Sequence, residues 1–220
     1  MDVIPYQKFI KHAEKVTKEA SSMSGGGVFK GINHLEDGKV EVTDTYRLYK
    51  AKTTHNLSGI YDVEGKEIEG KFPDFSSIFP EPKDAKAVVA LKATPALEAV
   101  KTIQQAGVFD YEGNKRKSKD KKSTILQIQT DGFIFKSVEL DNFVDVKCQS
   151  EFILTVEEEQ EDFKDNIFLN SQFLIDALTF FKDLGLELVP MYLYGYNKPI
   201  YFPFDGLGLW VIILPIKKEV

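Results

Sequence analysis

Three stretches of the chain repeat apolar residues every three or four positions, the spacing of a helix with one buried face. The first follows Pro5, a residue suited to the first turn of a helix, and ends in the glycine-rich segment 21–27. The second begins at Thr94 and the third is capped by Asn170, and a glycine follows each as a stop signal. The residues predicted to face inward are Phe9, Ala13, Val16 and Ala20, then Leu97, Val100 and Ile103, and last Phe173, Leu174, Ala177, Leu178 and Phe181.

Short runs between these helices are rich in β-branched and aromatic residues, or alternate apolar with polar positions, which predicts strands. Asp-Gly at 37–38 and Thr-Asp-Gly at 130–132 are hairpin turn signals, and a further hairpin is expected over 57–70. The expected strands are 28–35, 39–50, 87–91, 123–129, 133–140, 145–148, 151–156, 188–194, 199–204 and 209–215. Strand, helix and about three strands recur in this order. The pattern predicts an α+β fold of antiparallel sheets, built from about three repeated units.

The segment 42–50 contains a step that a regular strand does not favour. The pair Asp44-Thr45 is a poor strand interior, so a bend or bulge is expected there. A bend would place Arg47 and Leu48 on an exposed lip, as one charged and one apolar side chain. Asp44 is expected to form a local ion pair with Arg47 rather than to act as a catalytic acid. The alternative is an ordinary strand that runs into a turn.

Composition narrows the class of protein. The chain has 220 residues, enough for one or two domains, and a single cysteine, Cys148, which excludes an internal disulfide and a multi-thiolate zinc site. His12, His34 and His55 lack a ligand-like spacing, so neither a metal nor another cofactor is expected. No apolar run approaches the roughly 20 residues of a membrane helix, and the first residues do not resemble a signal peptide. A cytoplasmic protein without a membrane segment is expected.

Charge is distributed unevenly along the chain, whose net charge is −6. The segment 115–122 carries six positive charges and one negative, 157–162 is acidic, and lysines form a second stripe on the first helix. This segregation is typical of a protein that meets a polyanion on one surface, although solvated loops and a solvated helix face would read the same way. The candidate residues are Lys8, Lys11, Lys15 and Lys18 on the helix, and Lys115, Arg116, Lys117, Lys119, Lys121 and Lys122 in the loop.

Several short motifs, in their order along the chain, resemble the bacterial sliding clamp family, the β subunit of the replicative DNA polymerase. Thr-Asp-Thr-Tyr-Arg-Leu at 43–48 is similar to the family's Thr-Asp-Gly-His-Arg-Leu strand, and Phe-Pro-Asp-Phe at 72–75 is similar to its linker. The apolar run 211–217 resembles the family's C-terminal tail. Asn170–Leu178 and Asn-Lys-Pro-Ile at 197–200 also look like its last domain. The resemblance covers about residues 28–218.

The resemblance implies a domain organisation. Residues 1–71 would be half a clamp-like domain, the first half of the family's middle domain, 72–83 a linker, and 84–220 a complete domain like the family's last. A clamp chain has six units and this one three, so a truncated phage or mobile-element form is expected. Three units per chain imply a homo-oligomer, a dimer or a tetrameric ring, unless a loop such as 57–71 covers the first unit.

In the family, the strand, the linker and the tail build one apolar groove. That groove receives a short peptide rich in Gln, Leu and Phe from a DNA polymerase, the clamp loader or repair proteins. Thr45-Tyr46 stands here in place of Gly-His, and Leu214 and Ile216 in place of methionines, which implies a bulkier rim and a stiffer groove. Carried over, the groove residues are Phe29, Thr43, Arg47, Leu48, Pro73, Ile78, Ile212, Leu214, Pro215 and Ile216.

The function that the resemblance implies is a processivity factor, which tethers replication partners on double-stranded DNA without reading its sequence and is not an enzyme. The basic residues above would face the DNA. An alternative is a clamp-derived adaptor that binds the same peptides without encircling DNA. An unrelated α+β enzyme is the third reading, but the motifs of acyl hydrolases, zinc proteases and dinucleotide-binding proteins are absent.

Overall fold

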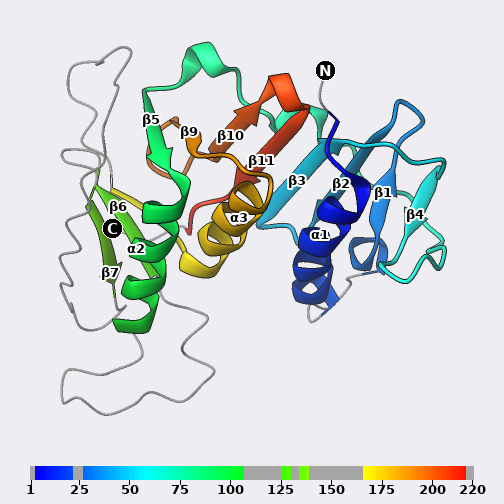
Figure 1. Cartoon of the computed structure of the whole chain (residues 1–220), viewed down its shortest axis with the longest axis horizontal. Helices are drawn as coiled ribbons and strands as arrows, with labels where there is room; N and C mark the ends of the chain where they lie inside the picture. The colour runs from blue at the N-terminus through cyan, green and yellow to red at the C-terminus, as the bar shows by residue number, and fades with distance from the viewer. Residues whose placement is uncertain (1–2, 22–26, 107–124, 130–133, 139–165, 217–220) are drawn as a thin grey trace. The chain divides into compact units, whose positions relative to one another are not determined.

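The protein was studied as a computed structural model, which describes residues 3–21, 27–106, 125–129, 134–138 and 166–216 (Figure 1). Its helices are α1 (Tyr6–Ser21), α2 (Ala93–Ala106) and α3 (Ser171–Asp183). The strands are β1 (Ile32–His34), β2 (Lys39–Thr43), β3 (Arg47–Lys52), β4 (Gly59–Tyr61), β5 (Ala87–Lys92), β6 (Ile125–Gln129), β7 (Ile134–Val138), β8 (Asn166–Asn170), β9 (Leu188–Leu193), β10 (Ile200–Phe204) and β11 (Leu209–Ile213). The predicted α+β class with antiparallel sheets is confirmed.

The chain divides into two compact units. Unit 1 comprises Met1–Glu81 and Tyr201–Ile212, and unit 2 comprises Pro82–Ile200 and Ile213–Val220. The segment 201–212 thus belongs to unit 1, although the sequence analysis assigned it to a domain 84–220. Compact units and repeated domains are different divisions of a chain, so the predicted domain boundaries stay a prediction.

Unit 1 is a sheet with the strand order β4-β1-β2-β3-β11-β10, on which α1 packs against β2 and β3. Val40 lies opposite Ala51 and Val42 opposite Tyr49, and all four are fully buried on the face that α1 covers. The other face carries the polar pair Glu41 and Lys50, joined by an ion pair of 2.6 Å. The fully buried apolar stripe of α1 is the predicted one: Phe9, Ala13, Val16 and Ala20.

Unit 2 combines α2 and α3, which pack against each other, with two antiparallel ladders. One joins β5 to β9 along six residues of each strand, and the other has the order β7-β6-β8. The Asn170 side chain accepts a hydrogen bond of 2.9 Å from the N–H of Gln172, so it caps α3 as predicted. Gly185 follows that helix with φ +79°, in the left-handed region that favours glycine. Strand β8 was not among the expected strands.

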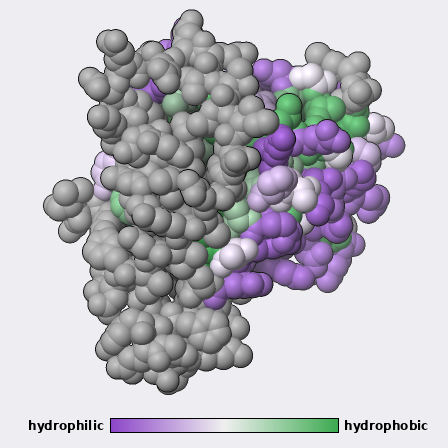
Figure 2. Space-filling model, turned by 60° about the vertical axis from the view of Figure 1, so that its left-hand side comes forward, coloured by the Kyte–Doolittle hydropathy of each residue, from purple (hydrophilic) through white to green (hydrophobic). Residues whose placement is uncertain are grey.

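Two predicted elements were wrong in detail. The single strand expected over 39–50 is a hairpin of β2 and β3, because the chain reverses at residues 44–46. The strand expected over 28–35 is limited to β1, since 27–30 form a 3-10 turn. Most of the surface that Figure 2 describes is hydrophilic, with smaller hydrophobic patches between. The expected strands 145–148 and 151–156 lie outside the described residues.

The outer edge of β4 is paired within the chain. Ile68 donates its N–H to the carbonyl of Ile60 at 2.8 Å, and Tyr61 forms a bridge with Glu67. The segment after β4 therefore folds back on the last strand of this sheet. An exposed edge is a template for pairing with another chain, and this one is blocked. That a loop such as 57–71 covers the first unit as a whole stays a prediction.

Aromatic rings fasten the start of α1 to the sheet of unit 1. His34, 2% exposed, is 5.0 Å from His55 and 5.5 Å from Tyr61 between ring centroids. Its Nδ1 is 2.9 Å from the carbonyl oxygen of Ile32, which can only accept, so Nδ1 carries a proton. The Nε2 of neutral His34 then accepts from the hydroxyl of Tyr6 at 2.8 Å. Burial first, and His55 second, lower the pKa of His34 below its ordinary value.

We expect this cluster to make the protein less stable in mild acid. The unfolded chain protonates His34 near pH 6.5, whereas the folded protein resists protonation. The stability that neutral His34 contributes is thus complete above that pH and is lost as the pH falls through the lowered folded pKa. Urea unfolding at a series of pH values should show a loss of up to about 1.4 kcal/mol per pH unit. The variant His34→Gln should lose less, and an unchanged slope in that variant would contradict this role.

Candidate functional site

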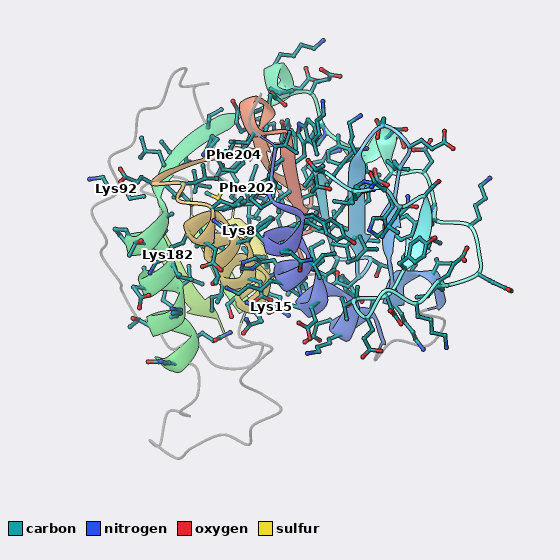
Figure 3. The ribbon with its side chains drawn as sticks, turned by 45° about the vertical axis from the view of Figure 1, so that its right-hand side comes forward. Lys8, Lys15, Lys92, Lys182, Phe202 and Phe204 are labelled. Atoms are coloured by element: carbon teal, nitrogen blue, oxygen red, sulfur yellow. The ribbon has the colours of Figure 1, made fainter. Side chains whose placement is uncertain are left out.

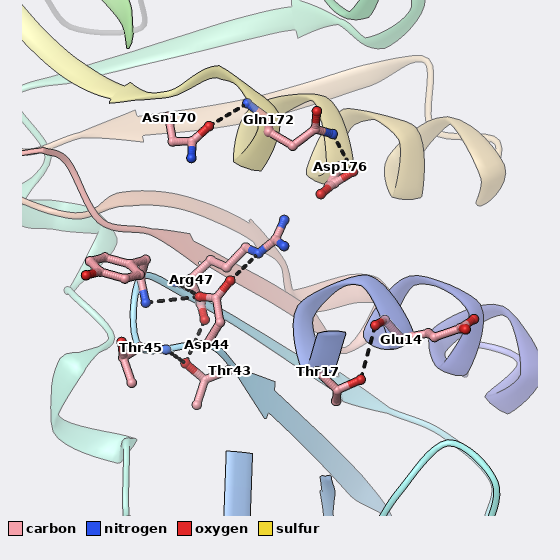
Figure 4. Close-up of polar contacts among 10 residues, drawn as sticks. Glu14, Thr17, Thr43, Asp44, Thr45, Arg47, Asn170, Gln172 and Asp176 are labelled. Carbon is pink, nitrogen blue, oxygen red and sulfur yellow. Dashed lines mark hydrogen bonds and ion pairs between the residues drawn. The ribbon is translucent and has the colours of Figure 1, made fainter. Parts of the chain in front are cut away.

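Asp44 organises the turn between β2 and β3 (Figure 4). Its Oδ1 accepts hydrogen bonds from the backbone N–H groups of Tyr46 and Arg47, both at 3.0 Å. Its Oδ2 accepts from the Nε of Arg47 at 2.9 Å. Burial raises the pKa of the Asp44 carboxyl above its ordinary value, although Arg47 and the two N–H groups act in the opposite direction. The predicted ion pair is confirmed, and it is fully buried.

Two threonines hold the remainder of this turn. The Thr43 hydroxyl donates to the carbonyl of Arg47 at 2.7 Å and accepts from the N–H of Thr45 at 3.0 Å. Thr45 has φ 74°, a left-handed conformation that costs a β-branched residue about 1–3 kcal/mol. The predicted bend is therefore confirmed as a tight reversal. It presents the side chain of Tyr46, which is 51% exposed.

The exposed lip predicted for Arg47 and Leu48 was wrong, because they are 1% and 2% exposed. The reversal ends before Arg47, so both residues lie inside β3. Leu48 stands opposite Thr43 in the ladder, and Arg47 is held by Asp44. Tyr46 is the exposed residue of this segment instead.

The linker is attached to unit 1 by aromatic rings. Phe29 is 5.7 Å from Phe72 and 6.5 Å from Phe75, and the last two are 5.8 Å apart. Phe29, one of the predicted groove residues, is thus half-buried in a structural cluster. Pro73, which comes between Phe72 and Phe75 in the sequence, is exposed, and Ile78 is 37% exposed.

The ten predicted groove residues divide between buried and exposed positions. Thr43, Arg47, Leu48 and Ile212 are buried in unit 1, where Pro73 and Ile78 are exposed. In unit 2, Leu214 and Pro215 are half-buried, and Ile216 is 37% exposed and donates its N–H to the carbonyl of Phe168 at 2.7 Å. Their assignment to a peptide groove stays a prediction.

The lysine stripe of α1 is mixed with acidic residues. Lys8, Lys11 and Lys18 are exposed and Lys15 is half-buried; Figure 3 labels Lys8 and Lys15. The helix has four lysines and two glutamates, and Lys18 is paired with Glu14 at 2.6 Å. The basic loop residues Lys115, Arg116, Lys117, Lys119, Lys121 and Lys122 lie outside the described residues. The prediction that these two groups face DNA is therefore untested.

Two cavities contain cationic side chains that the sequence analysis did not single out. One, of about 590 Å³ in unit 2, is lined by Lys92 and Lys182, labelled in Figure 3, and by the start of α2. Within the described part of the chain neither lysine has an ion-pair partner. The other, of about 250 Å³ in unit 1, has Lys39 and Lys50 in its wall. Lys92 and Lys182 are far apart in sequence, Lys39 and Lys50 stand on the two strands of one hairpin, and neither pair follows a motif.

Other kinds of site find no support in the residues that the structure describes. Within those ranges, no three His, Cys, Asp or Glu side chains gather closely enough to hold a metal ion. None of the described helices has the length and apolar composition that crossing a membrane requires.

The sequence matches no family model and no curated protein, but the fold matches solved structures. The DNA polymerase sliding clamp from Bacillus subtilis has a TM-score of 0.65 over 96% of this chain and 63% of that chain, at 15% identity. The beta sliding clamp of Caulobacter crescentus scores 0.69 over 96% and 64%, at 13% identity. The Helicobacter pylori beta clamp bound to a DNA ligase peptide scores 0.64 over 95% and 63%, at 15% identity.

These similarities show the fold. The chain has the sliding-clamp fold along nearly its whole length, as the motifs implied, and it spans 63 or 64% of the length of these three clamps.

We predict that the turn depends on Asp44 for stability. Asp44→Ala leaves a buried guanidinium without its carboxylate, which should lower the free energy of unfolding by about 3–5 kcal/mol. Asp37→Ala is the control, because Asp37 also pairs with a cationic side chain, that of Lys39, but is itself 51% exposed. That change should cost less than about 1 kcal/mol. Urea unfolding followed by circular dichroism measures both, and equal losses would refute the role of Asp44.

Proposed function

We propose that this chain is a sliding-clamp-like processivity factor, which tethers a DNA polymerase or a related partner on double-stranded DNA and catalyses no reaction. The observation that carries this proposal is the fold similarity to bacterial clamps over 95–96% of the chain. One of those clamps is described as bound to a DNA ligase peptide. A tether needs two surfaces, one for a partner and one for DNA.

The partner surface that we propose lies on unit 1, at the turn and the linker. Tyr46 and Ile78 are large, exposed and carried by segments with fixed backbones. Asp74 accepts the N–H of Ser76 at 2.8 Å and so shapes the short turn that ends at Ile78. Burying one such side chain against a Leu or Phe of a peptide contributes up to about 1.5–3 kcal/mol. A few such contacts give micromolar binding.

The DNA surface that we propose uses cations without a carboxylate partner. An unpaired ammonium meets a phosphate without first breaking an ion pair, and lysines on phosphates read no base edges. Lys92 and Lys182 meet this condition, and each is exposed. The lysines predicted on α1 belong to unit 1 and are proposed separately, and among them Lys18 is paired with Glu14 at 2.6 Å.

We expect Ile78→Asp to weaken binding of a Gln/Leu/Phe peptide by about tenfold or more, because the aspartate cannot replace the apolar contact. Leu48 is unsuited to this test, since a charge at a residue 2% exposed would destabilise the fold. Leu188→Asp is the matched control, because Leu188 is 60% exposed and belongs to unit 2 rather than to the turn or the linker. Calorimetry with both variants decides, and equal affinities would remove Ile78 from the site.

We expect DNA binding to weaken with salt, with a log–log slope of about −0.9 per phosphate neutralised. Changing Lys92 and Lys182 to Ala should flatten the slope by about 2. Changing Lys18 and Lys101 to Ala removes the same charge from lysines already paired with Glu14 and Glu98, and should flatten it less. Anisotropy titrations on duplex DNA measure this. Equal flattening would indicate that net charge alone matters.

Retention on nicked circular DNA distinguishes a processivity factor that encircles DNA from a clamp-derived adaptor that does not. A protein that encircles DNA stays on the circle until the DNA is linearised, whereas the adaptor would bind the peptide but leave the circle.

Sedimentation equilibrium with and without DNA tests whether the protein forms the predicted dimer or tetrameric ring. Because the edge of β4 is already paired within the chain, β4 does not supply the strand-to-strand contact for that assembly.

A further inference from the structure

We propose that the cavity of about 250 Å³ in unit 1 is a separate subsite, which accepts an aromatic side chain of a partner peptide next to an acidic residue. This inference rests on the proposed function, because it extends the peptide that the protein binds. The cavity shares no residue with the ten predicted groove positions. Its lining residues are Lys39, Lys50, Ser76, Phe79, Tyr201 and Trp210.

Three aromatic rings form the walls of this aromatic subsite, and their positions are fixed. Phe79 of the linker meets Tyr201 of β10 edge to face, with 6.0 Å between ring centroids. The indole N–H of Trp210 donates to the carboxylate of Asp205 at 2.7 Å, which holds the ring on β11. The Nζ of Lys50 lies 5.5 Å above the ring of Phe79. Rings held in this way bind a further ring without first losing their own freedom.

Size limits the occupant to a single side chain. Pockets for small-molecule ligands have volumes of about 300–1,000 Å³, and this cavity is smaller. Aromatic walls favour an aromatic ring, which packs on them edge to face or offset. A Phe or Tyr of a peptide has the matching size and chemistry.

The charge of the cavity wall favours one kind of residue next to that aromatic residue in the peptide. Two of the six lining residues are cationic and none is anionic. Lys50 is paired with Glu41, and Lys39 with Asp37, but each ammonium has three N–H donors and one carboxylate does not occupy them all. An arginine or lysine beside the ring would be repelled, and an aspartate or glutamate would gain a charge-assisted hydrogen bond.

The strand periodicity connects the aromatic subsite with the predicted groove. Lys50 is two residues from Leu48 on β3, and Trp210 is two residues from Ile212 on β11, so each pair lies on one face of the sheet. Two residues of a strand span about 7 Å. The aromatic subsite is therefore about 7 Å along the strands from the predicted groove positions Leu48 and Ile212, both of which are buried.

The test uses the intact chain and its single tryptophan, which is Trp210. Tryptophan-free peptides with a Gln-Leu-Ser-Leu-Phe core are compared with the same core carrying Phe-Asp, Ala-Asp or Phe-Lys at either end. We expect a Phe-Asp extension to bind about tenfold tighter than the core and to change the emission of Trp210. The Ala-Asp and Phe-Lys extensions should gain little.

Variants assign the gain to the aromatic subsite. Lys50→Met keeps the aliphatic stem and should abolish the preference for Asp over Lys, whereas Lys52→Met should retain it, because Lys52 lies on the same face of β3 but outside the cavity. Trp210→Phe keeps an aromatic wall and should retain the calorimetric gain that Trp210→Ala loses. Binding of the core without any gain from Phe-Asp would overturn the aromatic subsite and leave the proposed function standing. A Phe-Asp peptide that binds without the core having affinity would support the subsite alone, and no binding by either would overturn both.

Discussion

The buried ion pair between Asp44 and Arg47 is the interaction on which the described site depends. A carboxylate and a guanidinium that are both withdrawn from water are costly unless their hydrogen bonds are satisfied, and Asp44 accepts from three N–H groups, one of Tyr46 and two of Arg47. Those bonds fix the reversal at Thr45 and so set where β3 begins. The start of β3 in turn sets which residues of β2 lie opposite Leu48 and Lys50 on its outer face. The turn also decides that Tyr46, rather than Arg47, reaches solvent.

Aromatic packing fixes the position of the linker, as the ion pair fixes the conformation of the turn. The rings of Phe29, Phe72 and Phe75 hold its beginning, and the ring of Phe79 against Tyr201 holds its end. Between these two anchors, only a short turn carries Ile78. A linker held at both ends presents a fixed surface instead of a flexible connection. It forms one wall of the aromatic subsite. The partner surface that we propose on this face thus has a preformed framework, which would limit the entropy lost on association.

The two surfaces proposed for partner and DNA differ in how their charges are used. On the outer face of unit 1, lysines are paired with carboxylates, so that face offers aromatic contact with a modest cationic bias. Lys92 and Lys182 of unit 2 have no such partners in the described part of the chain. Paired lysines favour short-range, geometrically specific contacts, whereas unpaired ones favour a diffuse phosphate backbone. A net charge of −6 is compatible with DNA binding on these terms, because the local arrangement matters more than the sum.

The sequence by itself determined the elements with strong local patterns. The stripe Phe9 to Ala20, the cap at Asn170 and the pair Asp44 and Arg47 were all predictable, because each depends on residues within a few turns or positions of one another. The motifs at 43–48 and 72–75 also indicated the fold that the solved clamps share. Only the tertiary structure decided that Leu48 and Arg47 are buried, that β8 exists, and that 201–212 joins unit 1. The cavity residues Lys39, Phe79 and Trp210 come together for the same reason: strand order in a sheet is set by contacts between segments far apart in sequence, which no local pattern records.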